Sequence, residues 1–451
     1  MYLAYSLLLT LGLLVLIPHF LFQALAYGKY VAGLRQRFGG LNPINNGSRS
    51  VIWLHCVSVG ETQAARPLAA RLRTEFPDSF LVVSTITATG QSLARNVFQN
   101  HADAIIYFPF DWKWTVRRAI KAINPDLVLV METELWPNFL RECNSRGIPV
   151  VLVNGRISAQ SFRRYRLVRF FFRNVLAHLR MAVMQSDRDA ERIASLGMRD
   201  ERLFTTGNLK FDVDCTPPNA TTTELLRERF ALRPDVPLLL AASTHAPEEK
   251  IILKSFQRLR ALQPLRLMIA PRRPERFQEV AKLIEETGLT WAQRTGSPTA
   301  SDSGAEIILL DTIGELPTTY ALASIVFVGG SIVDRGGHNV LEPAATGACV
   351  VTGHHTHNFQ AIVQLLTDAD AIVQIPLARS DEAELYLTQI IQDLLRDERR
   401  RVELGRQARK IVRQNQGATD RTISLIKPLF KNHGVQSSAH EKVLATNSSG
   451  S

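Results

Sequence analysis

A chain of 451 residues has room for two or three domains with substantial cores. Its hydrophobic content of 45% and charged content of 21% are those of a folded protein rather than a disordered one. The net charge of +11 and the pI near 9.7 favour an anionic partner: nucleic acid, acidic lipid or a phosphorylated substrate. The scattered spacing of the cysteines argues against a zinc site or a disulfide framework; they are Cys56, Cys143, Cys215 and Cys349.

The first 28 residues contain no Asp, Glu, Lys or Arg and are rich in leucine. A helix of roughly 20 residues crosses a hydrocarbon core of about 30 Å, so this segment can span a membrane. Pro18 can kink or shorten the span, and Ala24-Leu25-Ala26 resembles a signal-peptide cleavage site. No basic residue precedes the apolar run, however, and the run is long for a signal. The basic residues that follow place the rest of the chain in the cytoplasm, and we predict a retained single-pass anchor; they are Lys29, Arg35 and Arg37.

Short apolar, β-branched runs alternate with helical patterns through the first half of the chain. This alternation predicts a parallel, doubly wound sheet whose ligands bind at the carboxyl ends of the strands. The predicted strands are 51–57, 81–86, 104–107, 127–131 and 150–153.

Glu61 lies at the first of these strand ends, in a turn that leads into a predicted helix ending near Phe76. A carboxylate at that position could take a proton from a hydroxyl nucleophile. The more common role for such a residue is a first-turn glutamate that the helix dipole favours.

The segment Met131-Glu-Thr-Glu-Leu-Trp-Pro-Asn138 follows another predicted strand. Its two carboxylates, Glu132 and Glu134, share a face if the backbone is extended and diverge if it is helical. The segment is therefore a candidate binding loop, and the spacing does not decide which glutamate reaches a ligand. The alternative is that Thr133 or Glu134 only caps a helix.

Residues 161–180 combine arginine and phenylalanine to an unusual degree. Arg166, Arg169 and Arg173 fall at i, i+3 and i+7, which is one face of a single helix. Such a face suits acidic lipid or a phosphorylated amphiphile, although a nucleic-acid patch or a plain solvated face has the same pattern. The N-terminal anchor favours lipid.

A segment of linker composition, 215–223, divides the chain, and the alternating pattern then restarts. Lys210 lies just before this linker, where it can reach an anion or remain solvated. The second half has a predicted helix at 248–262 and predicted strands at 238–242, 265–269, 307–310, 325–328 and 349–352.

Two strand ends in the second half carry candidate phosphate-binding residues. Pro271 and Pro274 stiffen a turn whose arginines suit a phosphate or are simply solvated; they are Arg272, Arg273 and Arg276. The segment 311–316 stands at another strand-to-helix edge, where plain helix capping is the alternative.

The strand 325–328 ends at Gly329-Gly330, and a helix predicted over 340–346 follows a second pair, Gly336-Gly337. Glycines let backbone N–H groups approach a ligand, and a helix N-terminus favours an anion such as a nucleotide phosphate. The alternative is an ordinary connection in which Asn339 is the N-cap and Glu342 reaches back to it.

Three histidines, His354, His355 and His357, lie within four residues, but adjacent positions rarely converge on one metal ion. We therefore predict no metal. The predicted organisation is an anchor (1–28), an acceptor-binding domain (29–215), a nucleotide-sugar-binding domain (216–432), whose last helix can cross back to the first domain, and a disordered tail (433–451).

Six motifs occur in the order seen in the 3-deoxy-D-manno-oct-2-ulosonic acid (Kdo) transferases, and the chain resembles that family from the anchor to about Gly417. The motifs are Val59-Gly-Glu-Thr62, Ser84-Thr-Ile-Thr-Ala-Thr-Gly90, Met131-Glu-Thr-Glu-Leu-Trp-Pro-Asn138, Gly207-Asn-Leu-Lys-Phe-Asp212, Asp311-Thr-Ile-Gly-Glu-Leu316, and Phe327-Val-Gly-Gly-Ser331 followed by Gly336-Gly-His-Asn339 and Glu342.

The resemblance implies an α/β GT-B fold, with two doubly wound Rossmann-like domains that face an interdomain cleft. It implies transfer of Kdo from CMP-Kdo to a lipid A precursor (lipid IVA) in lipopolysaccharide synthesis, with inversion and without a metal or other cofactor. The expected partners are CMP-Kdo, the lipid A precursor and inner-membrane lipids, with no nucleic acid, and the catalytic domains are expected to be cytoplasmic.

By position, Glu61 resembles the general base, and Glu132, rather than Glu134, resembles a second essential carboxylate. The residues that correspond to the family's donor site, or adjoin it, are Lys210, Arg272, Arg273, Thr312, Gly314, Glu315, Gly329, Gly330, Asn339 and Glu342, with Glu342 expected on the ribose. The expected acceptor-binding residues are Arg163, Arg166, Arg169 and Arg173. Arg273 departs from the family's usual His, and His354 from its common Pro.

Three other functions compete with this reading. One is a different GT-B enzyme, such as a UDP-sugar transferase or a sugar-nucleotide epimerase. The others are a membrane-attached protein that binds anionic lipid without catalysis, and a nucleic-acid binder.

Overall fold

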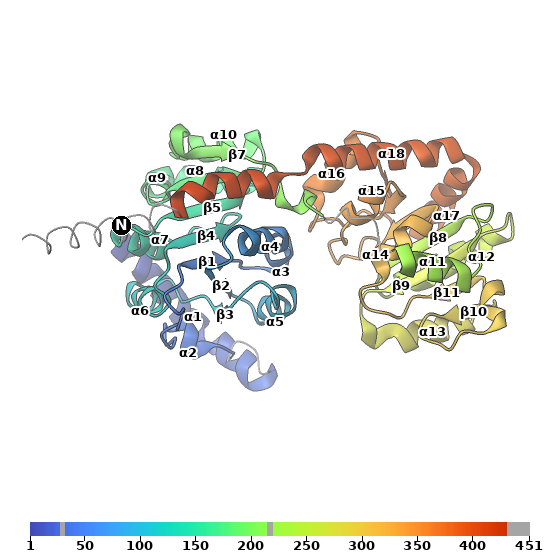
Figure 1. Ribbon diagram of the computed structural model, residues 1–451, viewed down its shortest axis with the longest axis horizontal. Helices are drawn as coiled ribbons and strands as arrows, with labels where there is room; N and C mark the ends of the chain where they lie inside the picture. Colours follow the sequence, from blue (N-terminus) through green and yellow to red (C-terminus); the bar gives the residue numbers. More distant parts are fainter. Residues whose placement is uncertain (28–31, 214–219, 431–451) are drawn as a thin grey trace, which may run out of the picture. The chain divides into compact units, whose positions relative to one another are not determined.

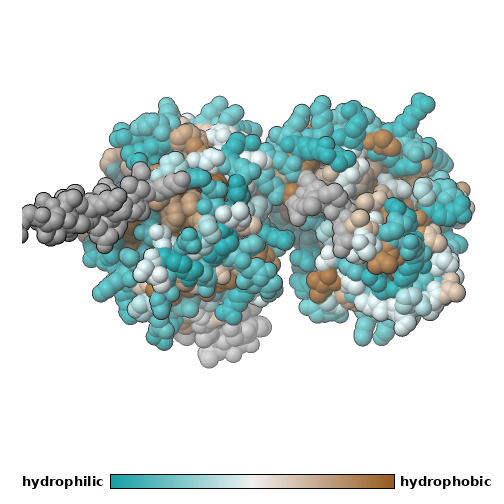
Figure 2. Space-filling view, viewed as in Figure 1, coloured by the Kyte–Doolittle hydropathy of each residue, from teal (hydrophilic) through white to brown (hydrophobic). Residues whose placement is uncertain are grey.

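The computed structural model describes residues 1–27, 32–213 and 220–430. The chain divides into two compact units: unit 1 comprises Met1–Asp212 and Asn415–Ser451, and unit 2 comprises Val213–Gln414 (Figure 1). The predicted anchor end at 28, the predicted domain boundary at 215, Cys215 and the predicted tail from 433 lie outside the described residues. Figure 2 shows that both units present mainly hydrophilic residues in this view.

Unit 1 is built on a seven-stranded parallel sheet with the order β3-β2-β1-β4-β5-β6-β7. The five strands predicted in this region are present within two residues at each end. Two short strands, β6 and β7, carry too few residues to show a pattern and were not predicted. The strands are β1 Val51–His55, β2 Phe80–Thr85, β3 Ala104–Tyr107, β4 Leu127–Met131, β5 Val150–Gly155, β6 Met181–Met184 and β7 Leu203–Thr205.

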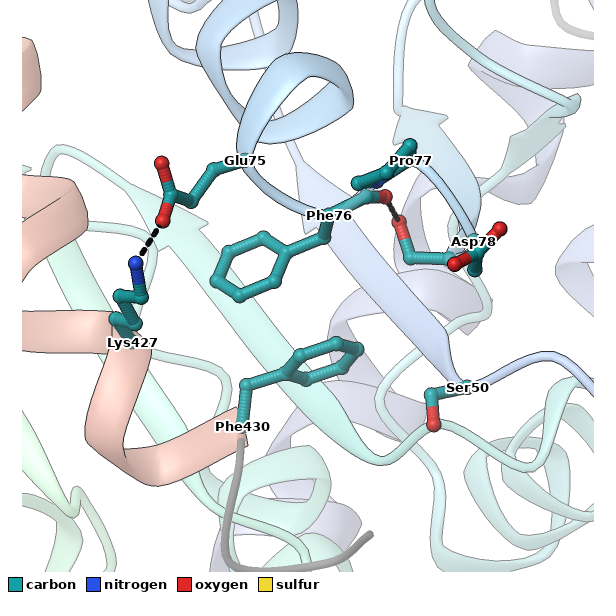
Figure 3. A pocket seen from close by; sticks show the side chains of 8 residues that line it. Ser50, Glu75, Phe76, Pro77, Asp78, Lys427 and Phe430 are labelled. Atoms are coloured by element: carbon teal, nitrogen blue, oxygen red, sulfur yellow. Dashed lines mark hydrogen bonds and ion pairs between the residues drawn. The ribbon is translucent and has the colours of Figure 1, made fainter.

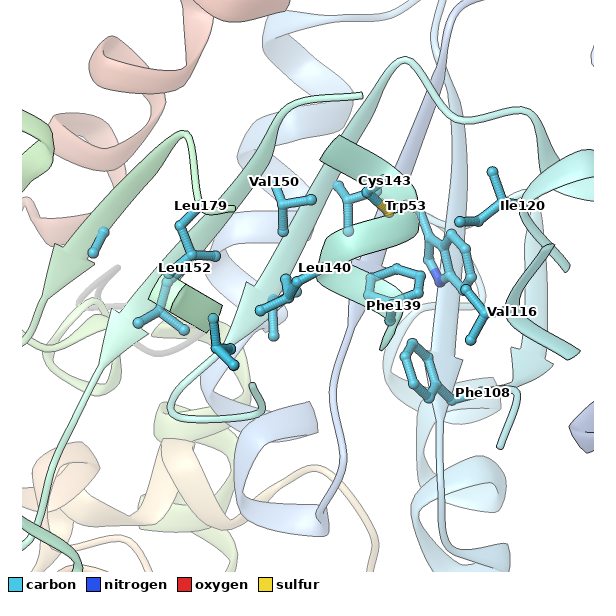
Figure 4. Close-up of a cluster of buried hydrophobic side chains, with 14 of the residues drawn as sticks. Trp53, Phe108, Val116, Ile120, Phe139, Leu140, Cys143, Val150, Leu152 and Leu179 are labelled. Atoms are coloured by element: carbon cyan, nitrogen blue, oxygen red, sulfur yellow. The ribbon is translucent and has the colours of Figure 1, made fainter. Parts of the chain in front are cut away.

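Helices cover both faces of this sheet (Figure 1). Successive strand residues point to opposite faces, so Trp53 packs into one core while Ile52 and Leu54 pack into the other. Figure 4 shows the first core, in which the Trp53 ring meets the edge of Phe139 at 5.0 Å between centroids. The helices are α1 Tyr2–Tyr27, α2 Leu34–Arg37, α3 Val59–Ala64, α4 Arg66–Glu75, α5 Ala88–Val97, α6 Lys113–Ile123, α7 Pro137–Ser145, α8 Ala159–Leu167, α9 Arg169–Leu176 and α10 Asp187–Ser195.

Helix α1 is the predicted apolar N-terminal helix. Its segment Tyr2–His19 is long and apolar enough to cross a membrane, judged by length and composition. Within the part of the chain that the structure describes, one helix can therefore attach the protein to a bilayer.

The prediction of one helix from the turn at Glu61 to Phe76 was wrong. The chain forms two helices, α3 and α4, which meet at Ala65. Pro67 stands in the first turn of α4. Because proline lacks an N–H, it is favoured at a helix start and ends the helix that precedes it. Glu61 consequently lies on a short helix of six residues.

The basic, phenylalanine-rich segment is likewise two helices, and the predicted single face of Arg166, Arg169 and Arg173 was wrong. The break is at Val168, with φ −116° and ψ 31°. Phe162 and Phe171 both pack against the core of unit 1. In one continuous helix these residues, nine positions apart, would point about 180° from each other. The break lets both rings reach the core.

Unit 2 is a second seven-stranded parallel sheet, with the order β10-β11-β9-β8-β12-β13-β14. The predicted α/β class with two doubly wound sheets is therefore confirmed; β10 and β14 were not predicted. The strands are β8 Leu238–Thr244, β9 Arg266–Pro271, β10 Trp291–Gln293, β11 Ile307–Leu309, β12 Ile325–Val328, β13 Cys349–Thr352 and β14 Val373–Gln374. The helices are α11 Ala220–Arg229, α12 Glu248–Arg260, α13 Phe277–Glu285, α14 Leu316–Thr319, α15 Leu341–Thr346, α16 Gln360–Asp368, α17 Ser380–Arg396 and α18 Glu398–Asn415.

The last helix, 418–430, belongs to unit 1 although it follows unit 2 in the chain. Its Ile423 and Ile426 side chains lie in the second core of unit 1. The Asp212 carboxylate accepts the N–H groups of Gly417 at 2.7 Å and Thr419 at 2.6 Å, which fastens the start of the helix.

The far end of this helix is held beside the amino ends of β1 and β2. Phe430 packs edge-on against Phe76 at 4.7 Å, and Lys427 pairs with Glu75 (Figure 3). A hollow of about 410 Å³ lies there, lined by these residues and by Ser50, Pro77, Asp78 and Ser79. It contains none of the predicted site residues, which follow the opposite, carboxyl ends of the strands.

Candidate active site

Glu61 and Glu132 lie at the point where the strand order of unit 1 reverses. Strand β1 pairs with β2 on one side and with β4 on the other. Glu61 follows β1 and Glu132 follows β4, so both stand at the carboxyl edge of neighbouring strands. Ligands of open parallel sheets bind in the crevice at this position.

The Glu61 carboxylate is held by its own turn and is 5% exposed. Val57 N–H donates to Oε2 at 2.8 Å, and the Ser58 hydroxyl donates to Oε1 at 2.9 Å. The Glu61 N–H in turn donates to Ser58 Oγ at 3.2 Å. Ser58 is thus the N-cap of α3, and Glu61 occupies the first-turn position that was the alternative to a catalytic role.

The surroundings of this carboxyl group nevertheless differ from those of a solvated cap. Burial raises the pKa of Glu61 to about 8, against the hydrogen bond from Val57, and the charges of Glu132 and Glu134 raise it further. A carboxyl group with a pKa near the working pH is suited to take and return protons. The geometry therefore supports both roles: Glu61 caps helix α3, and its carboxyl group is also suited to proton transfer.

Glu132 has a left-handed backbone conformation, with φ 53°. This conformation is costly for a residue other than glycine and occurs at functional sites more often than elsewhere. Neither the extended nor the helical alternative for the loop therefore applies. Its neighbour Glu134 is partly buried, and burial together with the Glu132 charge raises the pKa of Glu134 to about 7.

Lys210 is placed beside these carboxylates by a short 3-10 turn, Leu209–Phe211. Asn154 Oδ1 accepts the Leu209 N–H at 3.0 Å and so ties the turn to the end of β5. Burial lowers the pKa of Lys210, Glu132 and Glu61 raise it, and Arg156 lowers it. Three carboxylates and a lysine thus share one edge of unit 1. Arg156, which adjoins them, was not predicted.

Unit 2 repeats this arrangement, because β8 and β12 are neighbours at its own reversal point. The predicted use of Gly329 and Gly330 as N–H donors to a phosphate was wrong. Gly329 N–H donates to Ala242 O at 2.8 Å, and Gly330 N–H donates to Glu248 Oε2 at 2.7 Å. The chain's own carboxylate already occupies this loop.

Glu248 is buried and accepts four backbone N–H groups in total. Besides Gly330 they are those of His245, Ser331 and Ile332, each at 3.0 Å. The glycines meet a steric need instead: a Cβ at Gly329 would lie 2.8 Å from Ser243 O, and Gly330 has φ 67°. The loop is therefore fixed before any ligand arrives.

Two imidazoles adjoin this loop. His245 Nε2 and His338 Nε2 are 2.8 Å apart, and a Cβ at Gly330 would come within 2.9 Å of the His338 ring. Burial lowers the pKa of His338 to about 3, and the charges of His245 and Arg272 lower it further. The pair therefore shares one hydrogen bond between neutral rings.

The predicted pocket residues Asn339 and Glu342 contact each other at the start of α15. Asn339 Nδ2 donates to Glu342 Oε1 at 3.0 Å, and Leu341 N–H donates to Asn339 Oδ1 at 3.0 Å. This is close to the capping alternative, except that the N-cap position is Val340. The buried Tyr320 hydroxyl reaches the other oxygen of Glu342 at 3.4 Å and was not predicted.

The predicted residues Thr312, Gly314 and Glu315 form a turn after β11. Thr312 Oγ1 donates to Glu315 Oε2 at 2.7 Å, and Arg294 grips both oxygens of Glu315 at 3.0 and 2.9 Å. Gly314 has φ 90°. Arg294 was not predicted, because it is 21 residues from Glu315 in sequence.

Among the three arginines after β9, Arg272 and Arg273 are exposed. The suggestion that Arg276 is a phosphate ligand was wrong, because its guanidinium is held by two carboxylates. It contacts Glu249 at 2.6 Å and Glu279 at 2.9 Å. This leaves Arg272 and Arg273 as the donor-site candidates of that turn.

The predicted acceptor-binding residues are all exposed on α8 and α9; they are Arg163, Arg166, Arg169 and Arg173. Tyr165 on α8 lies close enough to Glu134 to feel its charge. Burial is the main cause that raises the pKa of Tyr165, and the Glu134 charge raises it further. Helix α8 therefore adjoins the sheet edge that carries Glu61, Glu132 and Glu134.

Among the described residues, no group of three or more His, Cys, Asp or Glu side chains is placed to hold a metal ion. Asp334, which is distant from the three histidines in sequence, lies 3.7 Å from His355 and 3.6 Å from His357 in space. Cys56 and Cys349, which lie in or beside apolar runs of the sequence, are buried.

Comparison with known proteins identifies the family. The family model described as "3-Deoxy-D-manno-octulosonic-acid transferase (kdotransferase)" matches residues 32–213. A 3-deoxy-D-manno-octulosonic acid transferase of Haemophilus influenzae is 34% identical over 410 residues, covering 89% of this chain and 92% of that protein. The chain belongs to the Kdo transferase family. A second member, from Bordetella pertussis, is 33% identical over 389 residues and is covered to 86% of its length.

This Kdo transferase is therefore a glycosyltransferase of lipopolysaccharide synthesis. Its fold is also found in a putative UDP-N-acetylglucosamine 2-epimerase of Listeria monocytogenes, with a TM-score of 0.54 over 85% of this chain and 97% of that one. The sequence identity there is 14%, so this likeness concerns the fold alone.

Proposed function

We propose that this Kdo transferase moves Kdo from CMP-Kdo to a lipid A precursor, lipid IVA, with inversion at the anomeric carbon. The observation that supports the mechanism best is the environment of Glu61. Its carboxyl group stands at the strand-order reversal of unit 1 beside Glu132 and Lys210, with a pKa near 8. This is the residue type, place and pKa that base catalysis on a hydroxyl group requires.

In the proposed step, Glu61 accepts the proton of an acceptor hydroxyl. The hydroxyl oxygen forms a bond to the anomeric carbon of Kdo as the bond from that carbon to the CMP phosphate oxygen breaks. Attack opposite the departing phosphate inverts the configuration, and CMP leaves with the electron pair. Glu132 and Lys210 would orient the reacting groups, because their charges act on Glu61 and on each other.

The donor would be held largely by unit 2. Exposed Arg272 and Arg273 suit the phosphate, and we propose Lys210 as a further donor-binding cation, as the family resemblance implies. The nucleotide would contact Thr312, Gly314, Glu315, Gly329, Gly330, Asn339 and Glu342, with Glu342 on the ribose. Because Gly330 N–H is bound to Glu248, we expect the glycine loop to contribute shape rather than N–H donors. We propose that these cations, and no metal ion, stabilise the leaving phosphate.

The acceptor carries phosphates and acyl chains, which fits the exposed arginines of α8 and α9 and the apolar helix α1. We propose that Arg163, Arg166, Arg169 and Arg173 bind its phosphates at the cytoplasmic side of the inner membrane. In this proposal the positive charge of the chain binds anionic lipid rather than nucleic acid.

The test is incubation of the full chain in detergent micelles with CMP-Kdo and a tetraacyl lipid A precursor, followed by mass spectrometry of the lipid and NMR of the new anomeric centre. A lipid heavier by Kdo, with inverted configuration, supports the proposal. Failure of CMP-Kdo to react while a UDP-sugar is consumed would refute it.

A Glu61→Gln variant separates catalysis from binding in the same assay. We expect turnover to fall by about 10²–10⁴-fold, the usual worth of a general base, with lipid binding retained. Glu191→Gln, an exposed glutamate on α10 of the same unit, is the matched control and should keep full turnover. Equal activity in both variants would exclude Glu61 as the base.

A further inference from the structure

Helix α1 is docked along one face onto unit 1 over its first three turns. Three hydrogen bonds at four-residue spacing hold that face: Tyr2 Oη with His178 Nε2 at 2.7 Å, Asn138 Nδ2 to Ser6 Oγ at 3.0 Å, and Trp112 Nε1 to Thr10 Oγ1 at 2.9 Å. Residues four apart share one side of a helix, so the polar side chains of α1 form a continuous edge against the protein. Figure 1 shows α1 running along unit 1 near α6.

Ring contacts continue this docked edge. Tyr2 and Tyr5 lie 6.3 and 6.1 Å from the ring of Phe171 on α9, and the Arg141 guanidinium lies 4.6 Å from the Tyr2 ring. The partly buried positions of α1 are 2, 5, 6, 9, 10 and 13, which is helical periodicity. From position 14 to position 19 every side chain is exposed, so the partly buried face, within the side chains that the structure describes, reaches to Leu13.

The opposite face of α1 is apolar and mostly leucine, and its side chains are exposed. Its exposed fractions are Leu3 87%, Leu7 61%, Leu8 69%, Leu14 56% and Val15 78%. Exposed apolar surface of this extent marks a contact with a membrane or a partner. The composition of its surroundings decides between the two.

Aromatic side chains flank both ends of the docked segment, and basic side chains flank the end at Tyr2. Beside Trp112, the partner of Thr10, the rings of Phe38 and Trp114 stack at 6.0 Å, and Trp114 is 50% exposed. Next to Phe171 on α9, Phe170 is 79% exposed, as is the basic set Arg163, Arg166, Arg169 and Arg173 in large part. Tryptophan, phenylalanine and arginine beside a leucine face are the composition of a lipid headgroup boundary.

The length of α1 excludes the spanning arrangement as long as the helix stays docked. After Leu13, the 14 residues from 14 to 27 remain in α1. At about 1.5 Å per residue they reach about 21 Å, which is short of a hydrocarbon core of about 30 Å. The polar edge of the first three turns would also lose its partners inside lipid.

We propose that α1 lies in the plane of one membrane leaflet, with its polar edge on unit 1 and its leucine face among the acyl chains. The inference refines the membrane attachment in the proposed function and replaces the predicted single-pass anchor. It places both ends of the chain on the same side of the bilayer.

Protease protection of a full chain with one epitope before Met1 and another after Ser451 tests this topology. In spheroplasts both epitopes should survive added protease, and in inverted membrane vesicles both should be lost. Loss of only the N-terminal epitope in spheroplasts would show a spanning helix and overturn the proposal. A chain in the soluble fraction would instead refute membrane attachment itself, while Kdo transfer is assayed separately.

Paired substitutions test the docked edge. Ser6→Leu with Thr10→Leu makes α1 more apolar but removes two hydrogen-bond partners, so the unfolding temperature should fall by about 3–8 °C. Ala4→Leu with Gly12→Leu adds leucine on the exposed face, where a Cβ at Gly12 meets nothing within 4 Å. Because leucine also favours the helix more than glycine does, the unfolding temperature should not fall. The same unfolding temperature in the two double variants would contradict the docking of the polar edge of α1 onto unit 1.

Discussion

The Glu132 charge helps to hold the pKa of Glu61 near 8, although burial of Glu61 is the larger cause. The two residues are separated by 71 positions in sequence but follow neighbouring strands, β1 and β4. At neutral pH the proposed base is therefore mostly protonated before the reaction. As the pH rises and Glu61 ionises, the reaction rate should therefore increase while the stability of the folded chain decreases.

The pH dependence of the reaction should report the Glu61 ionisation. Since the base must be ionised to accept a proton, kcat/KM should rise with pH and level off above about 8. The measurement is the initial rate of Kdo transfer from pH 6 to 9.5 at low substrate concentration. A profile that is flat across pH 8 would contradict the role of Glu61.

The stability of Glu61→Gln should show the opposite trend. The pKa of Glu61 is raised in the folded chain from 4.5 to about 8, so the folded state holds its proton more tightly than the unfolded state. The stability of the natural chain therefore falls as the pH rises from about 4.5 to 8, and the glutamine variant escapes this loss. Calorimetry at pH 5 and pH 9 should find the variant more stable at pH 9, with a smaller difference at pH 5.

The buried carboxylate under the glycine loop offers a test in unit 2. Glu248→Gln replaces one of two accepting oxygens by an NH₂ group that faces N–H donors, so we expect a cost of about 2–4 kcal/mol. Urea unfolding of the full chain measures it. Glu285→Gln, an exposed change on α13, should stay within about 0.5 kcal/mol of the natural chain. A small effect of Glu248→Gln would mean that the loop is not held by this carboxylate.

The nucleotide pocket can be tested through Arg294. If Glu315 contacts the nucleotide, its orientation depends on the two hydrogen bonds from Arg294, and Arg294→Gln should weaken CMP binding. We expect Kd to rise about tenfold by calorimetry, which corresponds to about 1.4 kcal/mol. Arg233→Gln, whose exposed side chain pairs only with Asp235 among the contacts described for it, should leave Kd unchanged. Unchanged Kd in Arg294→Gln would move the nucleotide away from Glu315.

The alternation of apolar strands and helices was sufficient to predict both sheets, because buried parallel strands are continuous β-branched runs. It also placed Glu61 and Glu132 correctly at strand ends. The alternation of strands and helices did not predict contacts between residues that are distant in sequence. Glu248 binds a loop 82 residues away, and no local sequence pattern indicates that pairing. The break at Val168 was missed for the same reason, since the rings on both sides of it follow the core and not the helical repeat.

The return of the last helix to unit 1 makes a prediction about stability. Ile426 is fully buried in the second core, so Ile426→Ala should destabilise unit 1 by about 2–5 kcal/mol. Ser424→Ala, on the exposed side of the same helix, should change stability by less than about 0.5 kcal/mol. The measurement is denaturant unfolding followed by tryptophan fluorescence, since four of the five tryptophans lie in unit 1: Trp53, Trp112, Trp114 and Trp136. Similar losses in both variants would place the helix outside the core.

The same helix sets the order of events at the ribosome. Domains commonly complete themselves as they emerge, N-terminal part first. Here the residues that close the first sheet's second core, 418–430, are translated after all of unit 2. The second core of unit 1 therefore stays incomplete, with apolar side chains exposed, until residues 418–430 leave the exit tunnel. A chain that ends before residue 418, held on the ribosome by an added linker long enough to fill the exit tunnel, should consequently stay sensitive to protease in its first half even when its second half is already protected.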